Sequence, residues 1–327
     1  MSDREPARLE CSDGSRAMSN APHQSGIRRF TEFLMSPYVG LTTAALLWSG
    51  NFVIGRALRN QISPLTLNFW RWTIALGVLL LFTHGQLWAH RRVVLREWKL
   101  MVALGFTGVA AFQTCVYLAL VTTSALNALL LLVTTPLLTV FGAWALFRDP
   151  VTTRQLLGLG VSLVGAVLLI ARGSLSLLLG LHFGTGDLWM LLAVALWTAY
   201  SLLLKKRPAE LPQSVLLTAS AITGIIGMLP VYVWTQIGEE LPRLSTQAIW
   251  GLLYVSLFAS VLAFLFWNRG VAKLGPNRAS TFIYLMPFFG AVLSLIFLGE
   301  GVQGYQVIGS ILIFFGVVLM NWRQRVR

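Results

Sequence analysis

The sequence predicts an all-α integral membrane protein with ten transmembrane helices, arranged as two inverted five-helix repeats. Three observations lead to this expectation: long apolar runs, a one-sided distribution of basic residues, and an internal repeat. Of the 327 residues, 56% are hydrophobic and only 11% are charged, whereas soluble domains carry about 25% charged residues. The mean hydropathy of +0.71 agrees with an integral membrane protein.

The apolar runs begin after residue 36 and alternate with short polar breaks. Runs of about 20 residues cross the hydrocarbon core of a bilayer as helices, because a helix satisfies its own backbone hydrogen bonds. Turn-forming residues such as Pro64, Pro150 and Gly275–Pro276 lie in the breaks. The expected spans are 38–58, 64–83, 99–120, 124–147, 154–171, 187–204, 213–236, 246–267, 277–298 and 304–322.

The basic residues indicate how these spans are oriented. If the N-terminus lies inside, 20 of the 25 Lys and Arg residues fall in internal loops and tails, four fall outside, and Arg71 lies within a span. Such a bias is the positive-inside rule. We therefore expect a multi-pass protein of the inner (plasma) membrane with both termini in the cytoplasm. The net charge of +13 has the same explanation, so no nucleic-acid partner is expected.

Residues 1–35 are polar and mixed in charge, which predicts a disordered cytoplasmic tail. No apolar core of a signal peptide precedes Pro37. Cys11 lies in this tail and Cys115 in an apolar run, so neither a disulfide nor a metal site is predicted. The sequence also lacks a phosphate-binding loop. We expect no metal and no cofactor.

The internal repeat relates the two halves of the chain, 36–172 and 187–322. Near the start of each half, Ala45–Gly50 (ALLWSG) matches Val194–Ala199 (VALWTA) at an offset of 149 residues. Because each half holds five spans, an odd number, the second half is expected to be inverted relative to the first. Pairs that match at an offset of 151 are Pro136 and Pro287, Asp149 and Glu300, Gln155 and Gln306, Gly158 and Gly309, and Gly165 and Gly316.

Together, these motifs resemble the EamA-type family of the drug/metabolite transporter superfamily over about residues 36–322. The resemblance implies transport of amino acids, other metabolites or drugs, most often outward. Two positions depart from the family pattern: Asp149 stands where Glu is more frequent, and Tyr200 stands in place of Asn. The matching residues are Trp48-Ser49-Gly50-Asn51, Arg71, Thr123-Ser124-Ala125, Pro136, Asp149, Gln155 and Gly158, then Trp197, Gly275-Pro276, Pro287, Glu300, Gln306 and Gly309.

Arg71 is a candidate substrate-binding residue because it is the only formal charge well inside a span. A charge at membrane depth costs about 2.5 kcal/mol or more. One interpretation has the guanidinium meeting a substrate carboxylate or holding a cavity wall. The alternative is structural: the side chain reaches the membrane surface or binds backbone carbonyls of a neighbouring helix.

Trp48 and Asn51 share one helical face in the first half, and Trp197 and Tyr200 repeat the spacing in the second. Aromatic rings stack on flat substrates and bind cations, so these four residues are candidates for lining a central cavity. Ordinary helix packing is the alternative. Weaker candidates of the same kind are Tyr117, Tyr254, Trp267 and Tyr284.

Pro136 and Pro287 interrupt the fourth and ninth spans, where each is expected to act as a hinge or to shape the cavity. Asp149 and Glu300 are expected to be helix N-terminal caps. Asp187, which opens its span, is either a cap or an entrance residue. No acidic residue lies deep in a span, which argues against a proton relay.

The sequence thus favours a secondary transporter, an exporter or facilitator, of small metabolites such as amino acids or drug-like solutes. The alternatives are a membrane-embedded lipid-modifying enzyme and a channel. An enzyme requires clustered His, Asp or Cys residues, which this sequence lacks, so no enzymatic activity is expected. The expected partners are a small-molecule substrate and membrane lipid, while the sequence gives no indication of oligomeric state.

Overall fold

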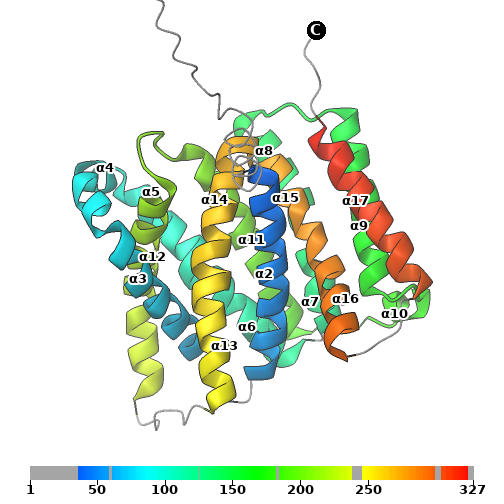
Figure 1. Cartoon of the computed structure of the whole chain (residues 1–327), viewed down its shortest axis with the longest axis horizontal. Helices are drawn as coiled ribbons and strands as arrows, with labels where there is room; N and C mark the ends of the chain where they lie inside the picture. Colours follow the sequence, from blue (N-terminus) through cyan, green and yellow to red (C-terminus); the bar gives the residue numbers. More distant parts are fainter. Residues whose placement is uncertain are drawn as a thin grey trace, which may run out of the picture. The chain divides into compact units, whose positions relative to one another are not determined.

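The computed structural model describes residues 36–58, 61–123, 125–181, 184–237, 245–298 and 303–322. The predicted tail 1–35 and the predicted cap Glu300 lie outside these residues. The chain from Pro37 onward forms one compact unit. Within its described part, all elements are helical (Figure 1).

The first half of the unit contains the elements from α2 to α10. The third predicted span is built from three consecutive pieces and the fourth from two. The elements are α2 (Pro37–Leu58), α3 (Pro64–Ala89), α4 (Arg91–Arg96), α5 (Trp98–Leu104), η1 (Gly105–Ala111), α6 (Phe112–Thr122), α7 (Ala125–Leu132), α8 (Thr135–Phe147), α9 (Thr153–Ile170) and α10 (Leu175–Leu179).

The second half repeats this subdivision, since its third and fourth predicted spans are again divided. The elements are α11 (Thr185–Leu203), η2 (Leu204–Lys206), α12 (Gln213–Gln236), α13 (Thr246–Ser256), η3 (Leu257–Leu262), α14 (Ala263–Leu274), α15 (Pro276–Ser280), η4 (Thr281–Tyr284), α16 (Leu285–Leu298) and α17 (Gly304–Asn321).

Nine helices within the described chain are long and apolar enough to cross a membrane. They correspond to nine of the ten predicted spans. The exception is the predicted span 277–298, which consists of α15, the 3₁₀ turn η4 and the 14-residue α16. Some predicted ends were also too early: α3 continues to Ala89 and α14 to Leu274.

The helix ends show why these segments start where they do. Ser63 caps α3, because its Oγ accepts a hydrogen bond from the Thr66 amide at 3.3 Å. Thr152 caps α9, and the Gln155 side chain accepts a bond from the Thr152 amide at 3.0 Å. The prediction that Asp149 caps this helix is therefore wrong. Asp149 lies four residues before Thr153, the first residue of α9, and pairs with Lys205 at 2.5 Å.

Two π-helical segments, η1 and η3, lie in the third and eighth spans at positions that correspond under the 151-residue offset. A π-helix widens the backbone turn and is frequent at functional sites. Backbone carbonyls of both segments accept side-chain hydrogen bonds. Asn68 donates to the carbonyls of Val109 and Ala110, both at 3.1 Å, and Trp48 donates to the carbonyl of Ala259 at 2.9 Å.

Helices α9 and α17 pack against each other through four glycines (Figure 1). A Cβ at Gly158 would lie 2.7 Å from the carbonyl oxygen of Gly316, and a Cβ at Gly165 would lie 2.7 Å from that of Gly309. Small residues that allow such close approach are typical of helix contacts in membranes. The contact is reciprocal, since Gly158 corresponds to Gly309 and Gly165 to Gly316 in the internal repeat.

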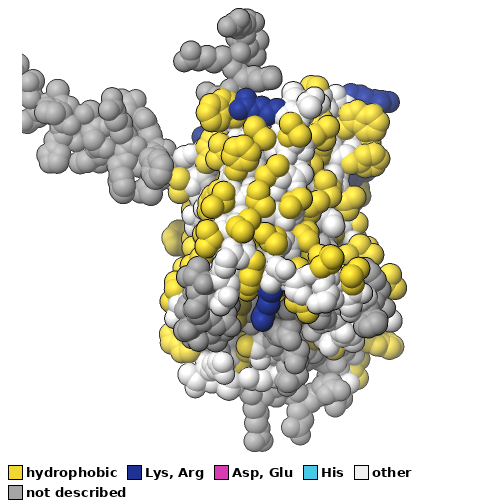
Figure 2. All heavy atoms as spheres, turned by 90° about the vertical axis from the view of Figure 1, so that its right-hand side faces the viewer, with side chains coloured by type: hydrophobic (Ala, Val, Ile, Leu, Met, Phe, Trp, Pro, Cys, Tyr) yellow, Lys and Arg dark blue, Asp and Glu magenta, His cyan; other side chains and the backbone are white. Residues whose placement is uncertain are grey.

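The outer face of these two helices is apolar. Figure 2 shows hydrophobic side chains covering much of the middle and upper part of this side of the molecule, with Lys and Arg side chains near its upper end and also lower down. Exposed residues here include Leu157 and Val164 on α9, and Ile311 and Phe315 on α17. An apolar face bordered by basic residues fits a surface that contacts lipid.

Candidate functional site

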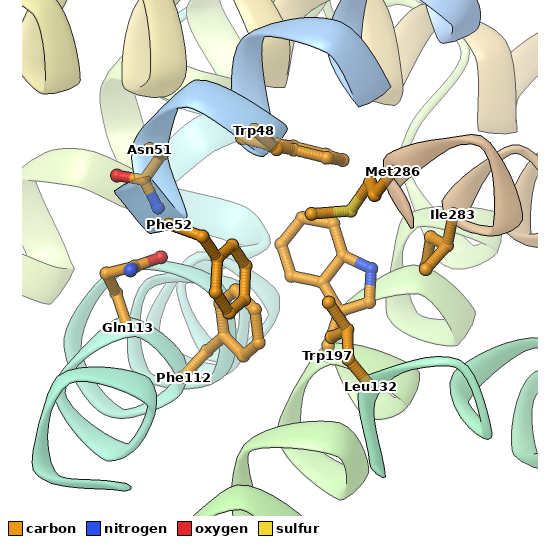
Figure 3. A pocket seen from close by; sticks show the side chains of 9 residues that line it. All are labelled: Trp48, Asn51, Phe52, Phe112, Gln113, Leu132, Trp197, Ile283 and Met286. Carbon is orange, nitrogen blue, oxygen red and sulfur yellow. The ribbon is translucent and has the colours of Figure 1, made fainter. Parts of the chain in front are cut away.

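A pocket lies in the interior of the helical unit and is lined by both halves of the chain (Figure 3). It contains about 350 Å³ of space between atoms, including space open to solvent. The cavity proper measures only about 20 Å³, which is room for about one water molecule, so the lining helices must move apart before a metabolite can enter. The first half supplies Trp48, Asn51 and Phe52 from α2, Phe112 and Gln113 from α6, and Leu132 from α7; the second supplies Trp197 from α11, Ile283 from η4 and Met286 from α16.

Four of the nine side chains that line the pocket are aromatic. Trp48 and Trp197, which correspond in the repeat, meet edge to face with their ring centroids 5.0 Å apart. Phe112 lies 4.7 Å from Trp197, and Trp267 backs both tryptophans at 5.4 and 5.3 Å. Edge-to-face contacts of this kind hold aromatic rings in defined orientations. The pocket therefore offers rigid ring surfaces to an apolar or aromatic solute.

The helix interruptions at the two prolines lie next to the pocket. Pro136 has no N–H to donate to the Leu132 carbonyl, and the hydroxyl of Thr135 donates to that carbonyl at 2.6 Å instead. Helix α7 thus ends at Leu132, a lining residue. In the second half, Pro287 directly follows the lining residue Met286 in the first turn of α16. Both prolines fall where lining helices begin or end.

Arg71 of α3 is completely buried and does not line the pocket. Its Nε donates to the Ser260 hydroxyl. Its Nη1 donates to Asn51 Oδ1 at 3.2 Å and to the Tyr117 hydroxyl at 3.0 Å. Its Nη2 donates to the Ala259 carbonyl at 3.2 Å. Arg71 thus joins α2 and α6 of the first half to η3 of the second, and it does not reach the membrane surface.

Asn51 connects this Arg71 network to the pocket. Its Oδ1 accepts hydrogen bonds from Arg71 and from the Tyr117 hydroxyl, the latter at 3.2 Å. Two donors on Oδ1 determine which side of the amide is oxygen. In Figure 3 the nitrogen of Asn51 lies on the pocket side and the oxygen points away. Asn51 therefore presents a hydrogen-bond donor to the pocket.

Tyr200 occupies the position that corresponds to Asn51, but it does not line the pocket. Its hydroxyl donates to Asn268 Oδ1 at 2.7 Å. Asn268 corresponds to Tyr117 at the 151-residue offset. In both halves a tyrosine thus donates to an asparagine between the first and third spans. In the first half the asparagine, Asn51, lies in the first span, whereas in the second half the tyrosine, Tyr200, lies there.

The structure brings together only some of the predicted site residues. Trp48, Asn51 and Trp197 line the pocket, whereas Arg71 and Tyr200 are buried and do not line it. Of the weaker candidates, Tyr117 joins the Arg71 network and Trp267 backs the aromatic wall. Tyr254 donates to the Leu47 carbonyl at 3.0 Å, away from the pocket lining.

Sequence reasoning missed the lining residues Phe52, Phe112, Gln113, Leu132, Ile283 and Met286. Only Gln113 gave a usable signal, an amide side chain within an apolar run. Asp187 lies at the start of α11 and accepts bonds from the Gly184 amide at 2.8 Å and the Thr123 hydroxyl at 2.5 Å. The described residues contain no group of three His, Cys, Asp or Glu side chains that would suit a metal ion.

Comparison with known proteins identifies the chain's relatives. An uncharacterized transporter, YyaM of Bacillus subtilis (strain 168), is 26% identical over 286 residues, which cover 86% of this chain and 92% of that protein. A probable terminal-alkyne amino-acid exporter of Streptantibioticus cattleyicolor is 25% identical and covers 86% of this chain and 92% of its own length. A probable amino-acid metabolite efflux pump of Salmonella typhimurium is 24% identical over 55% of this chain and 62% of its own length.

The fold and the family are also recognised. A solved structure, described only as the crystal structure of a protein, superposes with a TM-score of 0.70 at 20% identity and covers 87% of this chain and 96% of that chain. The model of the EamA-like transporter family matches twice, over residues 35–171 and 184–322. These two matches span most of the sequence, and the chain therefore belongs to the EamA-like transporter family.

Proposed function

We propose that this family member is a secondary carrier, an exporter or facilitator, for small metabolites such as amino acids or drug-like solutes. The observation that carries the proposal is the pocket between the halves, with Trp48 from one half and Trp197 from the other in its wall. A site shared by two repeats is the arrangement on which alternating access depends. The names of the two exporter-type relatives support an amino-acid-like cargo.

The proposal includes ten spans in two inverted repeats, 36–172 and 187–322. Three observations support it: the family model matches once in each half, the glycines of α9 and α17 pack reciprocally, and the π-helical segments η1 and η3 correspond. A reciprocal contact is what two-fold symmetry produces at an interface. The ninth span would then be formed jointly by α15, η4 and α16.

We further propose that the protein resides in the inner membrane with both termini in the cytoplasm. In Figure 1, α2 begins and α17 ends at the same end of the helical unit, as an even number of crossings requires. The concentration of basic residues in the loops and tails predicted to be internal supports the assignment of that end to the cytoplasm.

Flux through proteoliposomes tests the carrier proposal. The purified chain is reconstituted, and uptake of labelled amino acids and of small aromatic acids is measured against an excess of the same unlabelled solute inside. A carrier is expected to show saturable uptake that is accelerated by the internal solute. Protein-free liposomes provide the background. Flux that rises linearly with concentration would indicate a channel instead, and chemical change of the lipid would indicate an enzyme.

A further inference from the structure

We propose that the pocket selects apolar solutes that carry a carboxylate, which the amides of Asn51 and Gln113 bind at one end of the pocket. This inference rests on the proposed carrier function and specifies its substrate class. Figure 3 shows the two amides on the same side of the pocket, apart from Leu132, Ile283 and Met286. The pocket thus has one polar end.

The first observation is that the amide of Asn51 cannot turn freely. Arg71 and Tyr117 both donate to Oδ1, and a flip of the amide would place its NH₂ group against the Arg71 guanidinium, which can only donate. The NH₂ group has no hydrogen-bond partner among the described residues. Asn51 is therefore a fixed, unused donor on the pocket wall.

The second observation is the unsatisfied amide of Gln113. This side chain is only 4% exposed, and its Nε2 has no hydrogen-bond partner in the described structure. An unpaired buried polar group costs about 1–3 kcal/mol, so the pocket gains when a ligand supplies an acceptor. In Figure 3 the Gln113 oxygen lies nearer the pocket than its nitrogen, and no hydrogen bond within the described structure holds the amide in this orientation. A turn of the Gln113 amide would place a second N–H donor beside that of Asn51, and two neighbouring donors suit the two oxygens of a carboxylate.

The third observation concerns charge. Arg71 is a fully buried cation, and none of its hydrogen-bond partners is acidic. The four carboxylates of the described chain are engaged elsewhere, Glu97 and Glu210 with Arg96, Asp149 with Lys205, and Asp187 with Thr123. No acidic side chain lines the pocket either. The polar end of the pocket therefore has a positive potential that favours an anion over a cation.

The fourth observation is that the second half lacks these donors. Tyr200 replaces Asn51 and is committed to Asn268, and Phe264 stands at the position that corresponds to Gln113. The symmetric part of the lining is apolar: Trp48 and Trp197, and Leu132 and Ile283. The two ends of the pocket therefore differ because the two halves differ in sequence. A bound solute would place its carboxylate at the amides of the first half and its apolar body among the aromatic rings.

Three probes of equal body size test this inference: 3-phenylpropionate, 3-phenylpropanamide and phenethylamine. Binding to the purified full-length chain is measured by calorimetric titration in detergent, and flux is measured in proteoliposomes. The carboxylate is expected to bind best, and the neutral amide about tenfold more weakly because it loses one charge-assisted bond. The ammonium probe is expected to bind least.

Asn51→Asp is the decisive variant. An aspartate still accepts from Arg71 and Tyr117, so the network is retained, but its second oxygen replaces the donor that faces the pocket. We expect affinity for 3-phenylpropionate to fall tenfold or more and the preference between the carboxylate and the ammonium probe to shift toward the ammonium. An unchanged preference in this variant would overturn the inference.

Asn51→Leu and Asn268→Leu form a matched pair, because each removes an asparagine that accepts a hydrogen bond from a tyrosine. The two asparagines are almost equally buried, with Asn51 2% exposed and Asn268 1% exposed. Only Asn51→Leu is expected to weaken carboxylate binding, whereas both lower thermal stability. Equal loss of binding in both variants would overturn the inference. Saturable flux with a preference for the ammonium probe would reject the carboxylate site while leaving the carrier function intact; absence of saturable flux for every probe would reject the carrier function itself.

Discussion

Arg71 shows how a single residue can connect the two halves. Burial of a charge in a membrane protein is tolerated when polar groups of the protein replace water. Here a hydroxyl, an amide oxygen, a phenol and a backbone carbonyl do so, and the last is available at the π-helical segment η3. The guanidinium fork suits this arrangement because it presents several donors in one plane. In the proposed carboxylate site, Arg71 would act on the pocket through its hydrogen bond to Asn51, as a positioning residue.

Replacement of Arg71 tests this role. Arg71→Ala removes the hydrogen bonds that Arg71 donates to Ser260, Tyr117, Asn51 and the Ala259 carbonyl, of which only the carbonyl keeps the Trp48 donor at full strength. We expect a loss of roughly 2–4 kcal/mol in stability. Arg71→Lys keeps the charge but cannot reach all four partners, so an intermediate loss is expected. Thermal unfolding in detergent gives the stability, and flux kinetics give the apparent substrate constant.

A positioning role predicts that Arg71→Lys also raises the apparent substrate constant for carboxylates more than for amides, because the orientation of Asn51 and the local potential both change. A purely structural role would lower stability and leave the ratio of the two constants unchanged. Equal thermal stability of Arg71→Ala and the parent chain would contradict the hydrogen-bond network described here.

At the residue scale, helical spacing placed Trp48 and Asn51 on one face because residues three apart share a helix face. The structure has both of them and Trp197 in the pocket wall, and their role in substrate binding stays a prediction. The same argument placed Tyr200 in the cavity, whereas its hydroxyl is drawn away to Asn268. That contact depends on the packing of α11 against α14, which spacing within one helix does not specify. The lining role of Phe52 and Phe112 was unpredictable for the same reason, since phenylalanines occur throughout the apolar runs.

At the scale of elements, the glycines of α9 and α17 determine how closely two helices approach. Each of the four glycines has a backbone atom of the partner helix within 3 Å of the place where a Cβ would lie. Helix association in membranes depends on such close packing because lipid offers no hydrophobic driving force. The repeat in the sequence predicted that these glycines correspond, but it did not predict that they contact each other.

Substitution of Gly165 tests the contact. In Gly165→Leu the added side chain meets the Gly309 carbonyl and Ile313, so α9 and α17 must separate. We expect a loss of roughly 2 kcal/mol or more. Gly160→Leu is the matched control, because a Cβ at Gly160 of the same helix would have no atom of another described helix within 4 Å. Its stability is expected to stay within about 0.5 kcal/mol of the parent chain. Equal effects of the two substitutions on thermal unfolding would contradict the proposed packing.

The interruptions of the spans were partly predictable. Pro136 and Pro287 indicated breaks in the fourth and ninth spans because proline removes a helix hydrogen bond, and α8 and α16 do start beside them. The π-helical segments η1 and η3 gave no comparable signal, since their sequences, GFTGVAA and LFASVL, are ordinary apolar stretches. Their hydrogen-bond partners, Asn68, Trp48 and Arg71, come from other helices.

At the scale of the whole molecule, two ion pairs connect the halves at the end that we assign to the cytoplasm. Lys205, which follows α11, pairs with Asp149, which precedes α9, at 2.5 Å. Arg96, which ends α4, pairs with Glu210 at 2.7 Å, and the hydrogen bonds that Arg96 donates to Glu210 and Glu97 raise the pKa of Arg96 above its usual value. In both pairs one partner belongs to each proposed repeat.

The topology can be tested with reporter fusions. The proposed ten spans place a reporter after residue 172 or 242 outside the cell and a reporter after residue 92, 207 or 325 in the cytoplasm. These outcomes follow from the basic loops and from an even number of crossings. Paired periplasmic and cytoplasmic reporters, such as alkaline phosphatase and a fluorescent protein, give the readout. A periplasmic signal from the C-terminal fusion would exclude ten spans with a cytoplasmic N-terminus.

The pair between Lys205 and Asp149 should open when a carrier exposes its pocket to the cytoplasm, because its partners belong to halves that move relative to each other. Asp149→Asn removes the ionic attraction while keeping the size of the side chain. Partly exposed pairs contribute about 0.5–1 kcal/mol, so the population open to the cytoplasm is expected to rise about two- to fivefold. The measurement is maleimide labelling of Leu132→Cys in the pocket, in inside-out vesicles and a background without Cys11 and Cys115.

Glu210→Gln is the matched control. The side chains of its pair, Arg96 and Glu210, are 62% and 53% exposed, whereas those of Lys205 and Asp149 are 36% and 27% exposed. Water therefore screens the Arg96–Glu210 pair more, and its loss is expected to change the labelling rate less. An unchanged labelling rate in Asp149→Asn would show that this pair does not hold the cytoplasmic end closed.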